Sequence, residues 1–490
     1  MARRSHIVIL VLLGTTGCMV GPDYRRPDVV TPPSWGELEP TSRTGGESSN
    51  ASHATADADV PTAWWTTFDD RTLTSLIERT VQSNPTLQQA EARVRQARAS
   101  RRIAAADLLP QIGASGSYTR ERTSKNGASQ ALGGKVIDFF QAGFDANWEV
   151  DVFGGIRRSV EAADASVEAA EQDRNAVLVS LMAEVGLEYV TYRSLQQRIV
   201  LAEHNLESQR ATLDLTRRLF KAGLAPELDV TRADAQAATT ASIIPTQKLQ
   251  AAQAVHRLGV LIGQPPMTLE AELASVEAIP LPPSEIAVGL PSELLLRRPD
   301  VARSERQLAA ATADIGVATR DLYPRFFITG AASLQSIHAS DFFNWESRAL
   351  SLGPAITWPI FSGGRIRANI ALQNATQEEL LAAYHAVVLQ AFQDVEDALV
   401  AFSQQQVSRT RLEEAVRANA RAAELARTSY GQGLTDFLTV LVAEQSLFTS
   451  QDTLAQSQRD VTLNLVALYK AVGGGWQAAA TTEQVAGRGP

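Results

Sequence analysis

The sequence predicts an α+β membrane protein in which very long helices alternate with strands and the whole arrangement occurs twice. Three observations predict this fold class. An uninterrupted helical pattern runs over residues 155–220, stretches of strictly alternating residues precede it, and both return in the same order in the second half of the 490-residue chain. Helices and strands can be told apart because side chains recur on one helix face every third or fourth residue, but on one strand face every second residue.

The first long helix carries an apolar residue at every seventh position. These positions are Leu178, Val185, Tyr192, Ile199, Leu206, Leu213 and Phe220. A heptad stripe of this length is typical of a helix in a left-handed supercoil. At about 1.5 Å per residue the helix is roughly 100 Å long, several times the length of an ordinary globular helix. Gly223 and Pro226 then predict a turn, after which a second helix from Glu227 completes a hairpin.

The second half of the chain contains the same hairpin. Its stripe is broken only at Arg409, and its apolar members are Val388, Val395, Phe402, Val416, Ala423 and Tyr430. The turn recurs at Gly433, which lies 210 residues after Gly223. We therefore interpret the chain as an internal duplication, with a first structural repeat at 63–284 and a second at 285–476.

The two ends of the chain lack the composition of a packed core. Residues 1–17 combine two arginines with a short apolar run, which is typical of a signal peptide and too short for a transmembrane helix. Cleavage would leave the single cysteine, Cys18, at the N-terminus, where bacterial lipoproteins are acylated; an incidental cysteine is the alternative, and Thr15 departs from the usual lipoprotein signal. Residues 18–62 predict a lipid-anchored extended segment, and 477–490 a disordered tail.

Four stretches of the sequence alternate with the period of a strand. They lie at 111–119, 140–152, 326–335 and 350–360, with a polar loop at 122–135 and an awkward Pro354 in the last strand. The polar face of the second stretch predicts a strand that lines a water-filled lumen through Asp145, Asn147, Glu149 and Asp151. An apolar outer face with aromatic residues near the strand ends favours a membrane location over the alternative, a soluble sheet with solvated carboxylates.

Four strands cannot close a barrel, because the smallest closed membrane barrels have about eight. We therefore expect a homotrimer with a twelve-stranded outer-membrane β-barrel, four strands per protomer, that is continued by an α-helical barrel built from the long hairpins. A lipid-anchored periplasmic coiled-coil scaffold without a pore is the competing interpretation. The alternating strands argue against it, because a scaffold has no use for a lipid-facing strand set.

Composition and motifs argue against other classes of protein. A net charge of -9 without a basic patch argues against nucleic-acid binding, and six scattered histidines with one cysteine predict no metal site. The sequence contains no Ser/His/Asp set and no phosphate-binding glycine loop in a strand-to-helix context, so we expect neither an enzyme nor a bound cofactor.

A series of short motifs gives the chain a resemblance to a known family. In order along the chain they are Cys18 to Tyr24, Trp64-Trp65, Asn84-Pro85, Leu109-Pro110, Arg297 to Asp300, Tyr323-Pro324, Phe361 to Gly364 and Leu468 to Trp476. The sequence resembles the TolC-type outer-membrane factor family, and within it the lipoprotein branch of the OprM and NodT group. The resemblance implies a trimeric channel-tunnel in the outer membrane that conducts drugs or other small molecules passively out of the cell.

The same resemblance implies the partners of the channel. They are a periplasmic adaptor protein, also called a membrane fusion protein, an inner-membrane efflux pump of the resistance-nodulation-division (RND) type, and outer-membrane lipid. The turns of the two hairpins would form the periplasmic tip, where the candidate adaptor contacts are Gly223, Leu224, Ala225, Gly433, Leu434 and Thr435. An exit duct for protein secretion or metal export is the alternative within the channel class.

In the TolC-type family, a leucine and an aspartate four residues later narrow the periplasmic opening. The leucine is matched here by Leu438, but Val442 occupies the aspartate position and Thr439 a position that is acidic in some relatives. We expect a hydrophobic gate at Val442, with Asp229 and Asp436 supplying negative charge at its rim. The alternative is that Leu438 and Val442 are ordinary packing residues.

Overall fold

The computed structural model describes residues 19–38, 53–55, 60–126 and 134–478. They fall into two compact units. The sheet unit holds the described residues of 1–28, 93–171 and 303–385, and the hairpin unit holds those of 29–92, 172–302 and 386–490. Cys18, the predicted signal peptide (1–17) and most of the predicted C-terminal tail (477–490) lie outside the described residues. Among the described helices, none is both long and apolar enough to cross a bilayer.

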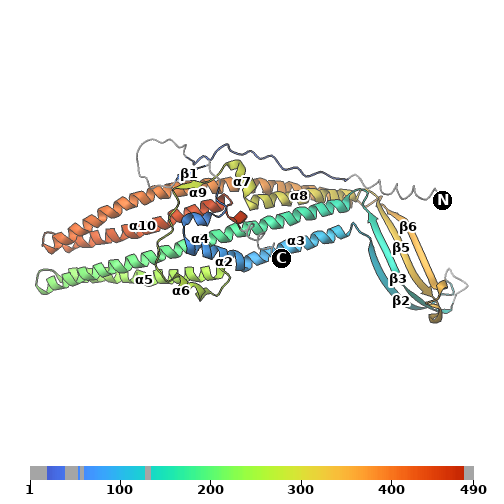
Figure 1. The fold of residues 1–490 in the computed structure, drawn as a ribbon, viewed down its shortest axis with the longest axis horizontal. Helices are drawn as coiled ribbons and strands as arrows, with labels where there is room; N and C mark the ends of the chain where they lie inside the picture. The colour runs from blue at the N-terminus through green and yellow to red at the C-terminus, as the bar shows by residue number, and fades with distance from the viewer. Residues whose placement is uncertain (1–18, 39–52, 56–59, 127–133, 479–490) are drawn as a thin grey trace. The chain divides into compact units, whose positions relative to one another are not determined.

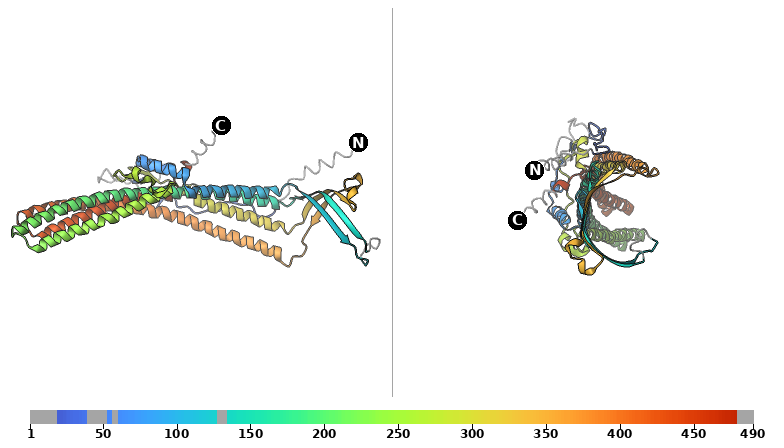
Figure 2. Two further views of the ribbon diagram at one scale, coloured as in Figure 1. Left: turned by 90° about the horizontal axis from the view of Figure 1, so that it is seen from below. Right: turned by 90° about the vertical axis from the view of Figure 1, so that its right-hand side faces the viewer.

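The sheet unit is built around one antiparallel sheet of four strands. These are β2 (Gln111–Arg122), β3 (Val136–Val150), β5 (Arg325–Ser336) and β6 (Arg348–Thr357). They pair in the order β2-β3-β5-β6 and lie side by side in a single curved layer (Figure 2). All four expected strands are present, but β3 begins before residue 140 and ends at Val150 rather than at 152, and β6 ends at Thr357 rather than at 360. Pro354 lies in β6, an edge strand, where a missing backbone donor is tolerated.

Two helices lead into the sheet, and a tryptophan holds each junction. Helix α3 (Pro85–Ala106) precedes β2, and α8 (Pro299–Arg320) precedes β5 (Figure 1). The indole N–H of Trp148 donates to the carbonyl of Leu108 at 2.9 Å, and that of Trp358 donates to the carbonyl of Leu322 at 3.1 Å. These carbonyls follow the last helical turns and have no partner within the helix, so each indole satisfies an acceptor that the helix leaves open. The two halves therefore make the same junction.

The hairpin unit contains most of the four long helices. They are α4 (Gly155–Lys221), α5 (Glu227–Leu261), α9 (Arg365–Gly431) and α10 (Phe437–Ala471), and they match the predicted hairpins closely. Most of the two heptad stripes is buried, while Ile199 and Val416 are half-buried and Phe220 is exposed. Burial of the stripe explains why helices this long persist, because packing rather than intrinsic propensity stabilises them.

Short elements complete both halves of the chain. A helix break falls at Asn84-Pro85, where α2 (Arg71–Ser83) ends before the asparagine and α3 begins at the proline. The break at Arg298-Pro299 separates α7 (Pro291–Arg297) from α8. The remaining elements are β1 (His53–Thr55), η1 (Trp64–Phe68), η3 (Pro266–Leu269), α6 (Glu270–Leu273), β4 (Glu285–Ala287), η4 (Ala339–Asp341) and η5 (Trp345–Ser347).

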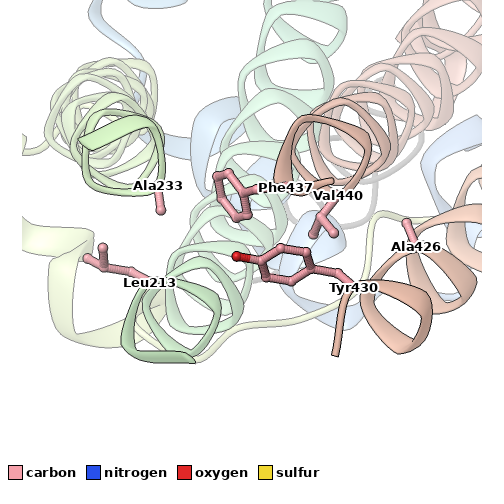
Figure 3. Packing of buried hydrophobic residues seen from close by; sticks show 6 residues of the cluster. All are labelled: Leu213, Ala233, Ala426, Tyr430, Phe437 and Val440. Carbon is pink, nitrogen blue, oxygen red and sulfur yellow. The ribbon is translucent and has the colours of Figure 1, made fainter. Parts of the chain in front are cut away.

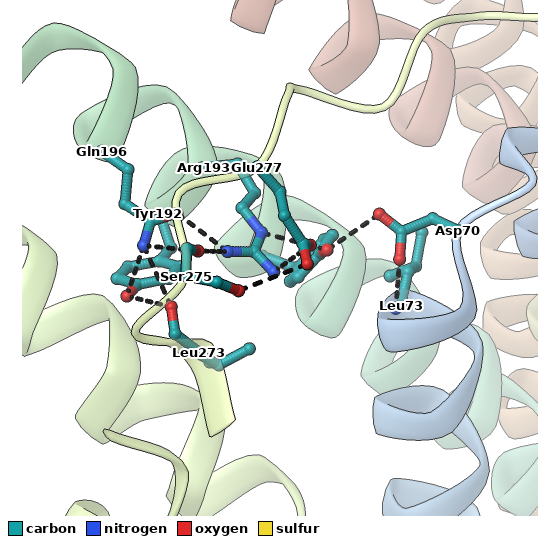
Figure 4. A network of polar contacts seen from close by, with 9 residues as sticks. Asp70, Leu73, Tyr192, Arg193, Gln196, Leu273, Ser275 and Glu277 are labelled. Atoms are coloured by element: carbon teal, nitrogen blue, oxygen red, sulfur yellow. Dashed lines mark hydrogen bonds and ion pairs between the residues drawn. The ribbon is translucent and has the colours of Figure 1, made fainter. Parts of the chain in front are cut away.

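A buried arginine joins α4 to the segments around it. Arg193 is 0% exposed, and its guanidinium donates to the carbonyl of Ser275 at 2.8 Å and pairs with Glu277 (Figure 4). Its Nε donates to Tyr189, whose hydroxyl donates in turn to Asp70, the residue that caps α2. Because a buried cation requires partners, this network fixes α2 and the chain after α6 to the part of α4 around Arg193.

Candidate functional site: the turns of the two hairpins

Both hairpins turn through the same backbone geometry. In the first, the N–H of Gly223 donates to Phe220 O at 2.9 Å and the N–H of Leu224 donates to Leu219 O at 2.8 Å, which is a Schellman motif. The same pair of hydrogen bonds recurs around Gly433. The two glycines have φ of +74° and +73°, a left-handed conformation that residues with a Cβ rarely adopt. The sequence predicted both stops for this reason.

The residues after each glycine form the accessible end of each hairpin. Leu224 is 76% exposed and Leu434 is 75% exposed, while Ala225 and Thr435 are half-buried. A Cβ added at Gly223 or Gly433 would meet no atom within 4 Å. Each turn therefore offers a small, open and partly apolar surface.

A hydrophobic cluster from all four long helices holds the two turns beside one another. We call it the tip cluster, and its buried members are Leu213, Ala233, Ala426, Tyr430, Phe437 and Val440 (Figure 3). The rings of Tyr430 and Phe437 have centroids 5.5 Å apart. Because interiors are close-packed, this cluster ties the position of one turn to that of the other.

The gate candidates lie on a different face of α10 from the tip cluster. Phe437 and Val440 are buried, whereas Leu438 is 45% exposed, Val442 is 56% exposed and Thr439 is exposed. Consecutive helical residues are turned by about 100°, so a single helix separates these two faces. Leu438 and Val442 therefore contribute nothing to the tip cluster and remain accessible within one chain.

The two aspartates near the turns have opposite electrostatic surroundings. Asp436 is the N-cap of α10 and accepts hydrogen bonds from the hydroxyl of Thr439 at 2.7 Å and from its N–H at 3.0 Å. These bonds hold the pKa of the Asp436 carboxyl below its ordinary value. Burial raises the pKa of Asp229, and the negative charge of Asp436 raises it further, against the opposing charge of Arg232.

A polar network that the sequence did not reveal links three helices next to the tip cluster. Glu444 on α10 is 5% exposed and accepts from Arg427 Nε on α9 at 2.6 Å. On α4, Thr212 donates to the same carboxylate at 2.9 Å, and Ser208 accepts from Arg427 at 2.7 Å. A heptad stripe identifies the buried face of each helix, but it does not specify which polar residues of two distant segments meet there.

The four candidate lumen residues have different environments in the sheet unit. Asp145 and Asn147 are exposed on β3, while Glu149 is half-buried and pairs with Arg320. Asp151 does not lie on the strand, which corrects the expected strand boundary. Its carboxylate accepts from two backbone N–H groups in the first turn of α4, at 2.9 and 3.1 Å. The open donors and positive dipole at a helix N-terminus account for this placement.

The described segment that follows Cys18 is held by a buried arginine of α4. Arg158 is 2% exposed and donates to the carboxylate of Asp23 at 2.7 Å and to the carbonyl of Val20 at 3.1 Å. Gly21 packs so closely on Gly316 of α8 that an added Cβ would lie 2.4 Å from its Cα. The residues that follow the proposed anchor therefore have a defined binding position on α4 and α8.

No group of three or more metal-binding side chains occurs among the described residues.

Comparisons with known proteins agree with this architecture. The family model described as outer membrane efflux protein matches residues 76–264 and 290–474. The chain is 35% identical to the pyoverdine export outer membrane protein OpmQ of Pseudomonas aeruginosa over 86% of this chain and 89% of that protein. It is 30% identical to the cation efflux system protein CusC of Escherichia coli over 95% and 98% of the two chains.

A solved structure, that of the outer-membrane channel OprN, has the same fold. It matches with a TM-score of 0.87 and 36% identity, and the match covers 94% of this chain and 100% of that one. The fold class predicted from the sequence and the family resemblance carried by its motifs are both confirmed.

Proposed function

The chain belongs to the outer membrane efflux protein family, and from this premise we propose that three copies form the gated exit duct of a tripartite efflux system. The outer membrane is its location, and export is its general role. A periplasmic adaptor and an inner-membrane pump of the RND type are the proposed partners. In support of the trimer, β2 and β6 each pair with only one other strand among the described residues, so the sheet has two free edges that neighbouring copies can join.

The observation that carries the gate proposal is the division of α10 into two faces. Phe437 and Val440 hold the turn in place, while Leu438 and Val442 remain exposed for contacts outside the chain. Three copies of an exposed valine around one axis would make an apolar constriction that excludes water and ions. Asp229 and Asp436 would supply negative charge beside it.

The open turns support adaptor docking at the same end of the hairpins. Two exposed leucines, Leu224 and Leu434, flank glycines that leave room for a second helical hairpin to approach. The names of the relatives refer to cargoes as different as pyoverdine and cations, so the family does not define one exported compound. In this proposal selectivity resides in the pump, and the duct conducts whatever the pump delivers.

Ion selectivity in planar lipid bilayers tests the gate. Val442→Asp should raise the cation-to-anion permeability ratio, because three carboxylates would then line the constriction. Val442→Asn is the matched control, since it adds polarity and similar bulk without charge, and it should leave the ratio close to that of the parent. An unchanged ratio for Val442→Asp would remove Val442 from the gate, and a Val442→Asp protein that conducts no ions at all would contradict the duct, because charged side chains would hydrate the constriction.

The lipid anchor is a separate part of the proposal. We propose that Cys18 is the acylated N-terminal residue, with Arg158 and Asp23 seating the segment that follows it. Intact mass spectrometry of the detergent-extracted protein should give a chain that begins at Cys18 and carries three acyl groups. A trimer of chains without acyl groups would be consistent with the duct and would contradict the lipid anchor.

A further inference from the structure

Each hairpin of the hairpin unit has a hollow at the same level. The second-hairpin cavity has a volume of about 540 Å³ and is lined in part by Asp394 and Ala398 of α9 and Ala471 of α10. The first-hairpin groove has a volume of about 420 Å³ and is lined by Glu184, Leu187, Glu188, His256, Arg257, Val260, Leu261 and Pro266. Shifting Glu184, Glu188 and Leu261 by the offset of the repeat gives Asp394, Ala398 and Ala471, so the two hollows are equivalent places of the duplicated fold.

The two hollows differ in one wall. Residues Ala176, Val179 and Ser180 of α4 line the second-hairpin cavity, although α4 belongs to the other hairpin. Val179 is only 6% exposed there. The first-hairpin groove has no corresponding wall, because all its lining residues come from its own hairpin and from Pro266 just after it.

The residues that would supply the missing wall are present on α9 but are exposed. The equivalents of Ala176, Val179 and Ser180 are Ala386, Leu389 and Gln390, and all three are exposed. Leu389 is 69% exposed, against 6% for Val179. One chain therefore has both an exposed apolar side chain on α9, that of Leu389, and an uncovered groove between α4 and α5.

We propose that Leu389 of a second copy of this chain packs into the first-hairpin groove, as Val179 packs beside the second hairpin within one chain. This inference rests on the proposed trimer and specifies which residues meet in it. The chemistry agrees, because the groove offers Leu187, Val260, Leu261 and Pro266 to an apolar side chain. Its charged rim is already partly neutralised, since Arg257 pairs with Glu188 at 2.8 Å.

A second copy fits this groove because the packing inside one chain supplies the template. Within one chain, the second hairpin is related to the first by one step of the internal repeat, and this step places α4 against α9 and α10. The same step taken once more places α9 against the α4 and α5 of the next copy. Each copy then gives one apolar side chain and receives one, which makes the contact head-to-tail, and in the proposed trimer three such contacts close the ring. An adaptor that covered this groove would leave the exposed face of Leu389 without a partner.

Cross-linking in native membranes tests the register of this contact. The full-length chain carrying Val260→Cys and Leu389→Cys is treated with a short bis-maleimide and separated on denaturing gels. We expect linked dimers and trimers. The matched control carries Val179→Cys and Lys470→Cys, the equivalent positions of the second-hairpin cavity, and should give an internally linked monomer. The parent, whose Cys18 thiol is acylated in the proposal above, and each variant with one added cysteine should give no ladder.

The outcomes separate this inference from the proposed function. A trimer by native mass spectrometry without a Val260–Leu389 cross-link, while the control pair reacts, would overturn the contact and leave the duct in place. A ladder of equal intensity from Leu389→Cys alone would overturn it as well. A monomer in native mass spectrometry would contradict both proposals. As a second measurement, Leu389→Glu should reduce the trimer fraction strongly, whereas Val30→Glu, at a residue that is 95% exposed in the N-terminal segment, should not.

Discussion

The two repeats have the same backbone but different side-chain chemistry. Helices α4 and α9 both have 67 residues, and α5 and α10 both have 35. Both hairpins end in a left-handed glycine with the same hydrogen bonds. Yet Pro226 precedes α5 where Asp436 caps α10. Chain stops and the heptad period therefore define the architecture, while the polar contacts around it differ between the two halves.

The clearest difference lies at the residue before the proline that opens α3 or α8. In the first repeat, Asn84 Nδ2 donates to the carbonyl of Leu261, the last residue of α5, at 2.7 Å. In the second, Arg298 Nη1 donates to the carbonyl of Ala471, the last residue of α10, at 3.1 Å. A neutral amide and a cation thus make the same contact with the end of the returning helix.

The cation needs partners that the amide does not. Arg298 pairs with Asp300 at 2.6 Å and with Asp394 at 2.9 Å, and its side chain is 10% exposed. Burial by itself would raise the pKa of Asp300, but the hydrogen bonds and charge of Arg298 outweigh burial and hold that pKa below its ordinary value. The second repeat therefore depends on a charge network where the first depends on a single amide.

Removal of these two side chains should have unequal effects. Arg298→Ala leaves two carboxylates and a helix-end carbonyl without their partner, and we expect it to lower the free energy of unfolding by about 3 kcal/mol. Asn84→Ala removes the contact with Leu261. It also removes the cap of α3, because Asn84 Oδ1 accepts hydrogen bonds from the first two N–H groups of that helix. We expect it to lower the free energy of unfolding by about 1–2 kcal/mol. Thermal unfolding followed by circular dichroism in detergent gives both values. Equal losses would mean that the charge adds nothing.

The two turns, in contrast, should respond equally. Gly223→Ala and Gly433→Ala each force a Cβ into a left-handed conformation, which costs about 1–2 kcal/mol, while the space around both glycines is open. Gly431→Ala is the matched control, because Gly431 has equally open surroundings and its φ lies outside the left-handed range. It should be neutral or slightly stabilising. The same unfolding measurement applies, and a harmless Gly433→Ala would contradict the common turn geometry.

Features that depend on local sequence could be predicted. The end of α4 and the start of α5 followed from Gly223 and Pro226, and another proline, Pro85, opens α3. At these three positions the proline or glycine acts through local backbone conformation, so its effect does not depend on distant residues. The alternating strands were found for a similar reason, because their period is a local property.

Features that depend on pairs of distant residues could not be predicted. Nothing near Arg298 in the sequence points to Asp394, and nothing near Glu444 points to Thr212. Asp151 continued the alternation of β3 and was therefore predicted on the strand, but the N-terminus of α4 offered its carboxylate two backbone donors. Competition between a strand position and a helix cap is decided by geometry that periodicity does not contain.

The smallest expected difference concerns the two tip aspartates at low pH. The pKa of Asp436 is lowered from 3.8, so its stabilising contribution is complete above that pH and is lost as the pH falls through the lowered value. The pKa of Asp229 is raised from 3.8, so its ionised form destabilises the folded turn, and protonation relieves this as the pH falls toward 3.8. Acidification should therefore first stabilise the start of α5 and then, at lower pH, destabilise the start of α10.

Hydrogen exchange at the two turns, corrected for the intrinsic effect of pH on exchange, measures this difference. Between pH 6 and about pH 4, protection should rise at the start of α5, and Asp229→Asn should abolish the rise because it removes the charge at every pH. Below about pH 4, protection should fall at the start of α10, and Asp436→Asn should make protection there low at every pH. Parallel behaviour of the two turns would show that one common process, and not two differently placed carboxylates, governs the acid response of the tip.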